Sequence, residues 1–187
     1  MDPHSPGRRY QLVFTPLVEG ASVVRGRIYR PHEDDAAPVS RTAGPCGPIL
    51  LTNGRGAMCR VHPDPMHIES KYDALLAVNL DPEVPCDRHV LVKRLRAWVS
   101  ADGFESALHQ ATRVDAGDNV ATWRWTIPAG ADRTAAVALE VHFVPGLNRL
   151  RLEFWRELAS DSGERDARLP GDAPVRLALR LDLEDRG

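Results

Sequence analysis

The stretch Val175-Arg176-Leu177-Ala178-Leu179-Arg180-Leu181-Asp182-Leu183-Glu184 decides the fold class of this chain. Branched apolar residues occupy every second position, and arginine, alanine, aspartate and glutamate fill the positions between them. Successive side chains of a β-strand point to opposite faces, so a period of two predicts a strand with one buried and one solvent-facing side.

The same alternation recurs in two consecutive segments upstream. In residues 136–143 the apolar positions are Val137, Leu139, Val141 and Phe143, and residues 149–155 alternate in the same way. Pro145-Gly146 lies between the two segments and indicates a turn. Two alternating segments joined by a short turn predict an antiparallel hairpin.

Further strands are predicted at 11–14, 23–29, 49–52, 57–61, 74–80, 90–100 and 121–127. The total is about ten strands, and no convincing helix separates them, which argues against parallel βαβ units. We therefore expect an all-β antiparallel sandwich, supersandwich-like, as a single domain over residues 1–187. Two segments, 31–48 and 160–174, are rich in Pro, Gly, Asp and other charged residues and are predicted to be long, mobile surface loops.

Composition and charge restrict the possible partners. The formal net charge is -2, so no positive field attracts nucleic acid or an anionic membrane. No apolar run approaches the roughly 18 residues that span a bilayer, and the N-terminus lacks the apolar core of a secretion signal. The three cysteines form a poor disulfide framework, which fits a reducing compartment, and we expect a cytoplasmic protein.

One pattern of residues resembles a zinc site. Cys59 and His62 have the C-x2-H spacing, and Cys86 and His89 repeat it. The two pairs lie on different segments, however, and a lone histidine at the start of a strand more often packs or caps. We therefore expect no metal and no other cofactor, although the sequence leaves a metal at these four residues open.

Catalytic groups are not singled out by the sequence. Glycoside hydrolysis needs two carboxylates at a fixed separation, but the acidic residues near predicted loops are numerous and typical of solvated surface. Trp123 and Trp125 share one strand face and more often fill a core, whereas Trp98 or Trp155 could stack on a sugar if exposed. The basic run 90–98 is split between two strand faces, and Thr52-Asn53-Gly54-Arg55-Gly56 is typical of a tight turn rather than of a phosphate loop.

Five segments, in this order and spacing, resemble the N-terminal domain family of glycogen debranching enzymes (amylo-alpha-1,6-glucosidases). They are Ile49-Leu50-Leu51-Thr52-Asn53-Gly54-Arg55-Gly56, Lys71-Tyr72-Asp73-Ala74-Leu75-Leu76-Ala77, Asp87-Arg88-His89-Val90-Leu91-Val92-Lys93-Arg94, Ala101-Asp102-Gly103-Phe104 and Leu181-Asp182-Leu183-Glu184-Asp185-Arg186. The resemblance covers residues 49 to 187. It departs from the family at Arg55-Gly56-Ala57-Met58, where Gly-Gly-Tyr is usual, and at Lys71-Tyr72-Asp73, where Arg-Arg-Tyr-His is expected.

The resemblance implies a β-sandwich whose parent protein hydrolyses α-1,6 branches in a later (α/α) barrel. This chain is then a non-catalytic accessory or structural domain, either part of a longer protein or a separately encoded module. Its partners are the barrel and, through the turn residues Asn53, Arg55, Lys71, Tyr72 and Asp73, α-glucan; no catalytic residue is expected in it.

Two alternatives from other functional classes stay open. The first is an interaction or assembly module that joins a partner or a second copy through exposed sheet edges and has no glycan role. The second is a stand-alone carboxylate glycosidase, which we rank last because no acid pair is distinguished.

Overall fold

The computed structural model describes residues 10–16, 24–29, 47–81, 83–84, 87–158 and 167–186, and for 10–16, 24–29, 185 and 186 the backbone alone. Within these ranges the chain is all-β. Its strands are β1 (Tyr10–Pro16), β2 (Val24–Tyr29), β3 (Ile49–Thr52), β4 (Met58–Val61), β5 (Ala74–Asn79), β6 (Arg88–Ala101), β7 (Phe104–Ala107), β8 (Arg113–Ala116), β9 (Val120–Ala129), β10 (Arg133–Phe143), β11 (Leu150–Glu157) and β12 (Val175–Arg186). Each segment predicted as a strand is one, and β7 and β8 are additional.

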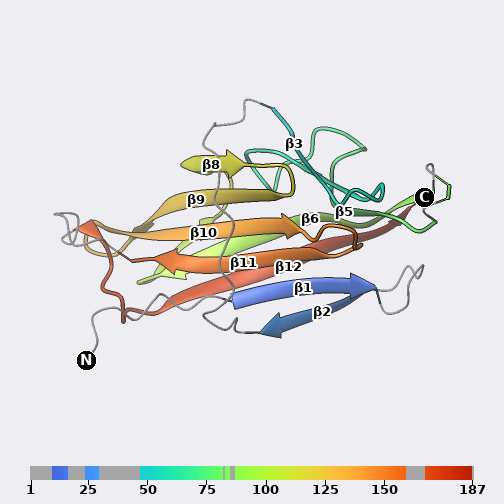
Figure 1. Cartoon of the computed structure of the whole chain (residues 1–187). Coiled ribbons are helices and arrows are strands. Elements are labelled where there is room, and N and C mark those ends of the chain that lie inside the picture. The colour runs from blue at the N-terminus through green and yellow to red at the C-terminus, as the bar shows by residue number, and fades with distance from the viewer. Residues whose placement is uncertain are drawn as a thin grey trace.

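The strands form two antiparallel sheets that make up the predicted sandwich (Figure 1). Sheet A has the order β2-β1-β11-β10-β9-β8, and sheet B has the order β12-β6-β5-β4-β3, with β7 also paired to β6. Neighbours in sequence are mostly neighbours in the sheets, as expected for antiparallel strands joined by short turns. The predicted all-β fold is confirmed.

The β10–β11 hairpin has the predicted register. Phe143 pairs with Leu150 at the turn, and Ala136 pairs with Glu157 at the far end. The inward positions of β10 are buried, as expected, but Ala138 and Glu140 on the other face are buried as well. Across the two ladders Glu140 stands between Thr122 and Glu153, which are also buried, so side chains of three adjacent strands shield one another on this face.

Trp123 and Trp125 belong to the core between the sheets. They are 0% and 4% exposed. Each buried indole needs an acceptor for its N–H: Trp123 donates to the carbonyl of His62 at 3.2 Å, and Trp125 donates to that of His109 at 3.1 Å. Both bonds join β9 of sheet A to loops that border sheet B.

The C-terminal strand β12 is less buried than its pattern suggests. Leu177 and Leu179 are each 37% exposed and Leu183 is 73% exposed, although all three lie on the predicted inner face. The reason is position, because β12 is the outermost strand of sheet B and its ladder in the described structure is with β6.

The two predicted mobile loops have different outcomes. Residues 31–46 of the first lie outside the described residues. Of the second, residues 167–174 are held in place: Leu169 is 5% exposed, and its N–H donates to the carbonyl of Thr134 at 2.8 Å. The described half of this segment is therefore packed against sheet A rather than mobile.

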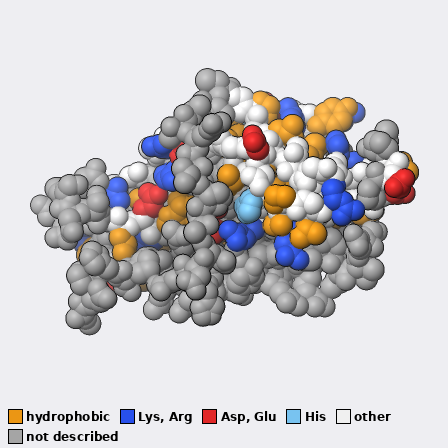
Figure 2. Space-filling model, viewed as in Figure 1, with side chains coloured by type: hydrophobic (Ala, Val, Ile, Leu, Met, Phe, Trp, Pro, Cys, Tyr) orange, Lys and Arg blue, Asp and Glu red, His pale blue; other side chains and the backbone are white. Residues whose placement is uncertain are grey.

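The surface seen in Figure 2 mixes charged side chains of both signs with hydrophobic ones. Among the residues that the structure describes, no helix is long and apolar enough to cross a membrane.

Candidate functional site

The segment between β4 and β5, residues 62–73, lies beside the long strand β6. β5 pairs with β6 only as far as Val92, so the next part of the β6 edge needs other partners. The segment supplies one, because Met66 accepts the N–H of Ala97 on its sulfur at 3.2 Å. A side chain of β6 also binds the segment, since the Lys93 ammonium donates to the carbonyl of Lys71 at 2.8 Å.

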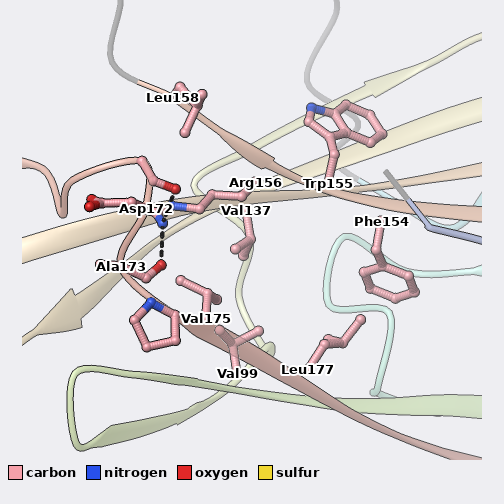
Figure 3. A pocket seen from close by; sticks show the side chains of 12 residues that line it. Val99, Val137, Phe154, Trp155, Arg156, Leu158, Asp172, Ala173, Val175 and Leu177 are labelled. Atoms are coloured by element: carbon pink, nitrogen blue, oxygen red, sulfur yellow. Dashed lines mark hydrogen bonds between the residues drawn. The ribbon is translucent and has the colours of Figure 1, made fainter. Parts of the chain in front are cut away.

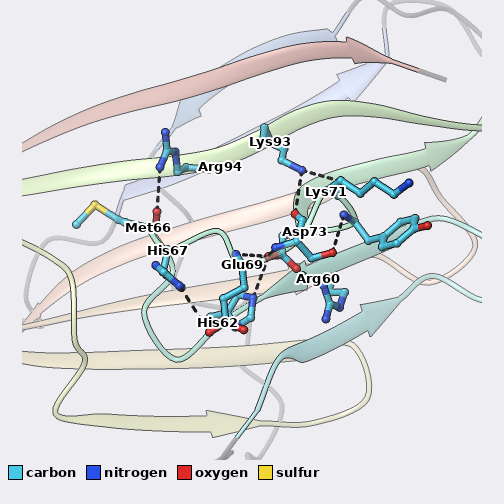
Figure 4. A network of polar contacts seen from close by, with 11 residues as sticks. Arg60, His62, Met66, His67, Glu69, Lys71, Asp73, Lys93 and Arg94 are labelled. Atoms are coloured by element: carbon cyan, nitrogen blue, oxygen red, sulfur yellow. Dashed lines mark hydrogen bonds and ion pairs between the residues drawn. The ribbon is translucent and has the colours of Figure 1, made fainter.

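Asp73 fixes the end of this segment (Figure 4). It is 2% exposed. Its Oδ2 accepts the backbone N–H groups of Glu69 and Ser70, both at 2.7 Å, and lies 3.0 Å from Nε2 of His62. Its Oδ1 accepts a bond from the guanidinium of Arg60. One buried carboxylate thus closes the segment onto β4.

These contacts keep Asp73 ionised. Burial removes water from the carboxylate, which by itself is the largest effect and would raise its pKa. The backbone donors at Ser70 and Glu69 and the bond with His62 together outweigh burial, so the pKa of Asp73 lies below its ordinary value. An acid with a lowered pKa is suited to holding donors in place and not to giving up a proton near neutral pH.

His62 is the second buried polar residue of the segment. Its Nδ1 lies 3.7 Å from Oε2 of Glu69, and the other oxygen of this carboxylate, Oε1, lies 3.6 Å from Nε2 of His67. The two imidazole rings meet edge to face with centroids 5.8 Å apart. Glu69 and His67 are both more than half exposed, so this end of the cluster faces solvent.

Tyr72 and Lys71 project from the anchored segment into solvent. Tyr72 is 61% exposed, and the Lys71 ammonium lies 5.0 Å from the centre of its ring. The Tyr72 N–H donates to Oγ of Ser70 at 3.1 Å, which fixes the backbone beneath the ring. An exposed aromatic ring on a fixed backbone is a surface against which a flat ligand can pack.

Asn53 organises the turn between β3 and β4. It is 3% exposed. Its Oδ1 accepts the N–H groups of Arg55 at 2.8 Å and Ala57 at 3.1 Å, and its Nδ2 donates to the carbonyl of Leu147 at 3.0 Å. The side chain therefore joins this turn to the β10–β11 turn of the other sheet.

Arg55 is the exposed member of this second group. Its guanidinium donates to the carbonyl of Gly146 at 3.2 Å. Gly54 and Gly56 have φ values of 77° and 86°, so the turn places its positive φ at the two glycines and not at Asn53, where the Asn-Gly pattern also predicts one. Gly56 packs closely on the side chain of Asn79, so a larger residue there would require this side chain to shift.

The five predicted contact residues thus form two groups at opposite ends of β4. Asn53 and Arg55 precede the strand, and Lys71, Tyr72 and Asp73 belong to the segment that follows it. A strand of four residues separates its ends by about 10 Å. The structure buries Asn53 and Asp73 and exposes the other three, a division that the sequence did not predict.

Arg60 and His62, the partners of Asp73, were missed as members of this site. The sequence pattern does not single out Arg60, and it indicates His62 only as a possible metal ligand. Both residues alternate with inward-facing residues at the end of β4, and this is the only sequence signal that they carry. It does not indicate that the Asp73 carboxylate, 13 and 11 residues further on, binds them.

The zinc pattern receives no support from the described residues, in which no three His, Cys, Asp or Glu side chains are placed to hold a metal ion. Cys86 lies outside them. Cys59 is fully buried, and burial raises the pKa of its thiol far above the ordinary value, which disfavours the thiolate that zinc binds. Nε2 of His62 faces Asp73, and Nε2 of His89 lies 3.2 Å from Asp87.

An apolar pocket of about 540 Å³ opens between the sheets where β11 meets β12 (Figure 3). Val99, Val137, Phe154 and Leu177 line it together with residues 171–175. The guanidinium of Arg156 donates to backbone carbonyls of residues 169, 170, 171 and 173, at 2.6, 2.8, 3.5 and 2.8 Å. Desolvation lowers the pKa of Arg156, against a smaller opposing effect of Asp172. Since its donors are used internally, Arg156 shapes the pocket wall.

Comparison with protein-family models gives one match. Residues 48–187 match the model described as the N-terminal region of glycogen debranching enzyme. The matched range includes both groups around β4 and every strand from β3 to β12. No curated protein and no solved structure matches the chain.

Proposed function

Because the chain belongs to the glycogen debranching enzyme N-terminal family, we propose that it is a non-catalytic domain that packs against the glycosidase barrel of a debranching-type enzyme and contacts α-glucan. The contact is made by exposed side chains at the two ends of β4. The observation that carries this proposal is Tyr72, an exposed ring on a segment whose base is fixed by a buried carboxylate.

A fixed, exposed ring is suited to packing against a sugar. Sugar rings have apolar C–H faces, and an aromatic side chain offers a large apolar surface at low entropic cost. The Lys71 ammonium beside the ring adds donors for sugar hydroxyls. Binding residues are often carried on loops held by a rigid scaffold, and the bonds to Asp73 supply that rigidity here.

Arg55 provides the corresponding exposed donor at the other end of β4. Asn53 and Asp73 take part indirectly, because each is buried and uses its polar atoms to hold a turn. Of the five predicted contact residues, Arg55, Lys71 and Tyr72 are therefore the ones proposed to touch glucan.

The electrostatics of Asp73 favour the non-catalytic role. A glycosidase needs a carboxyl group whose pKa is raised so that it can protonate the leaving oxygen. Asp73, the buried acid of the exposed segment, has a lowered pKa and four bonded donors. It supports a binding surface and not acid catalysis.

The same proposal includes a cytoplasmic location and excludes nucleic acid and membrane partners. Cys59 is a free, buried thiol, as is common in reducing compartments. The net charge of -2 offers no global attraction for polyanions.

Calorimetric titration of the 187-residue chain with maltoheptaose and with a branched limit dextrin tests the proposal, together with an assay for released glucose. We expect binding without glucose release, and Tyr72→Ala should weaken binding about tenfold or more, a loss of about 1.4 kcal/mol. Phe104→Ala is the matched control, since Phe104 is an aromatic residue of similar exposure, 51%, on β7.

Other results would count against it. Equal losses in Tyr72→Ala and Phe104→Ala would remove Tyr72 from the contact, and binding of neither glucan would remove the glucan role altogether. Glucose release by the chain alone would show a stand-alone glycosidase.

A second function is favoured by β12. In the described structure this strand ends sheet B, and Leu177, Leu179 and Leu183 are exposed along it, which is the kind of apolar edge that joins a second chain. The assembly module predicts a dimer whose fraction rises with concentration in sedimentation velocity and falls in Leu183→Lys. A monomer at high concentration would contradict it.

A further inference from the structure

The outer face of β6 and β12, on the side of sheet B away from the core, carries a group of arginines around one tryptophan. Directly opposite residues in an antiparallel ladder share a face. The register pairs Arg94 with Asp182, Arg96 with Arg180, Trp98 with Ala178 and Ser100 with Arg176. We call this surface the arginine–tryptophan face and define it by Arg94, Arg96, Trp98, Arg176, Arg180 and Asp182.

The face has more positive charge than its own acid can balance. Oδ2 of Asp182 accepts Nε of Arg94 at 2.6 Å and Nε of Arg96 at 3.0 Å, and its Oδ1 lies 3.3 Å from Nε of Arg180. Among the described residues, three guanidinium groups on one carboxylate leave two positive charges, whereas farther along the face Arg176 and Glu105, the two cross-strand neighbours of Ser100, carry opposite charges. Burial, the largest effect, opposes the negative charge of Asp182, but the bonds from Arg94 and Arg96 lower its pKa.

Arg96 and Arg180 stand directly opposite each other, and like charges in such positions destabilise a sheet. Arg180 is 65% exposed and Arg96 33% exposed. An external anion between them would relieve the repulsion. Arg96 gives Nε and Nη2 to Asp182, and Arg180 lies beside the same carboxylate through Nε. In the described structure the donors that face a phosphate are therefore Nη1 of Arg96 and the two terminal nitrogens of Arg180, and guanidinium N–H groups are well suited to phosphate oxygens.

Trp98 gives the face a second recognition element. It is half-buried, and its neighbours across both ladders are the exposed alanines Ala107 and Ala178, so no large side chain stands directly opposite the indole on either strand. Its N–H donates to no described residue, in contrast to the core residues Trp123 and Trp125. Within the part of the chain that the structure describes, the indole N–H of Trp98 is therefore open to a ligand.

We propose that the arginine–tryptophan face binds a phosphate ester of a sugar, with the sugar ring against Trp98 and the phosphate on Arg96 and Arg180. Same-face neighbours on a strand lie about 6.7 Å apart, which is close to the distance from a ring to a phosphate one or two bonds outside it. The phosphate charge of -1.5 to -2 at pH 7 matches the two unbalanced charges. The site is separate from the β4 groups and does not depend on the proposed glucan contact.

Proton–nitrogen NMR of the 15N-labelled 187-residue chain tests the proposal, because the four tryptophans give at most four indole N–H signals. Trp98→Phe identifies the signal of Trp98. Titration with glucose 6-phosphate should move this signal saturably, with a Kd of about 1–10 mM, as expected for a small exposed site. Inorganic phosphate should bind more weakly, and glucose should not move the signal.

Arg180→Gln should weaken glucose 6-phosphate about tenfold. Arg113→Gln should leave the Kd unchanged, since Arg113 is a comparably exposed arginine, 55%, paired with Asp115 on sheet A. Asp182→Asn should tighten binding because it removes the competing carboxylate. No movement of the Trp98 signal, equal movement by glucose, an equal Kd for phosphate alone, or an equal loss in Arg113→Gln would each overturn the proposal.

Discussion

His62 and Asp73 lie 3.0 Å apart, Nε2 to Oδ2, and their side chains are 6% and 3% exposed. The pair joins the first and last residues of the segment 62–73 between β4 and β5. The same Asp73 oxygen accepts the N–H groups of Glu69 and Ser70. Such a buried carboxylate is costly unless its donors are all present. The exposed ring of Tyr72 is therefore held by a network that tolerates little change.

Asp73→Ala should lower the free energy of unfolding by about 3 kcal/mol, because it leaves Arg60, His62 and two backbone N–H groups without their acceptor. Urea unfolding measures the change. Asp81→Ala is the control, since Asp81 lies on an exposed turn, and it should change stability by less than about 1 kcal/mol. Similar losses in the two variants would show that the network contributes little.

The stability of the chain should fall in acid in a way that depends on Asp73. Its pKa is lower folded than unfolded, so its contribution is fully present above the unfolded value of about 3.9 and is lost as the pH falls through the lower, folded value. Asp182 adds a loss of the same sign. Urea unfolding between pH 7 and pH 3 should show that the free energy of unfolding falls less on acidification in Asp73→Asn than in the original chain. An equal fall in both would contradict the role of Asp73 in acid stability.

Alternation predicts the strands well because it reflects a local rule, the opposite directions of successive side chains. It finds the β10–β11 hairpin with its register, but it misses β7 and β8. Both strands are short and mix apolar with polar or charged residues, Phe104-Glu105-Ser106-Ala107 and Arg113-Val114-Asp115-Ala116, so they lack the apolar run that reveals the equally short β3, Ile49-Leu50-Leu51-Thr52. Their place is set by the edges of β6 and β9 to which they pair.

The same limit applies to the candidate site. The sequence identifies the residues around β4, and the Asn-Gly turn follows from local chemistry. The burial of Asp73 does not, because it depends on Arg60 and His62, 13 and 11 residues away. Likewise the outward-facing Glu140 is buried among its cross-strand neighbours Thr122 and Glu153, an arrangement that no single segment reveals.

Gly56→Ala should destabilise the chain more than Gly54→Ala. Both glycines have positive φ, 86° and 77°, so each substitution introduces backbone strain of about 1 kcal/mol. A Cβ at residue 56 would also lie 3.0 Å from Nδ2 of Asn79, whereas one at residue 54 meets nothing within 4 Å. Thermal unfolding of the two variants should therefore separate the effect of backbone strain, which both share, from the effect of the contact with Asn79. Equal melting temperatures would show that the Asn79 side chain moves aside without cost.

Arg156→Ala should loosen the segment 167–174, because its guanidinium holds the carbonyls of residues 169, 170, 171 and 173. The single ammonium of lysine lacks the planar fork and cannot bond all four carbonyls. Arg156→Lys should therefore keep only part of the stability that is lost in Arg156→Ala. We expect the free energy of unfolding to fall by about 2 kcal/mol in Arg156→Ala. Hydrogen exchange should rise at the N–H of Leu169, which bonds to Thr134, while the Trp123 indole N–H in the core stays protected. Unchanged exchange at Leu169 would mean that the isolated bridge between β10 and residue 168 holds the segment without Arg156.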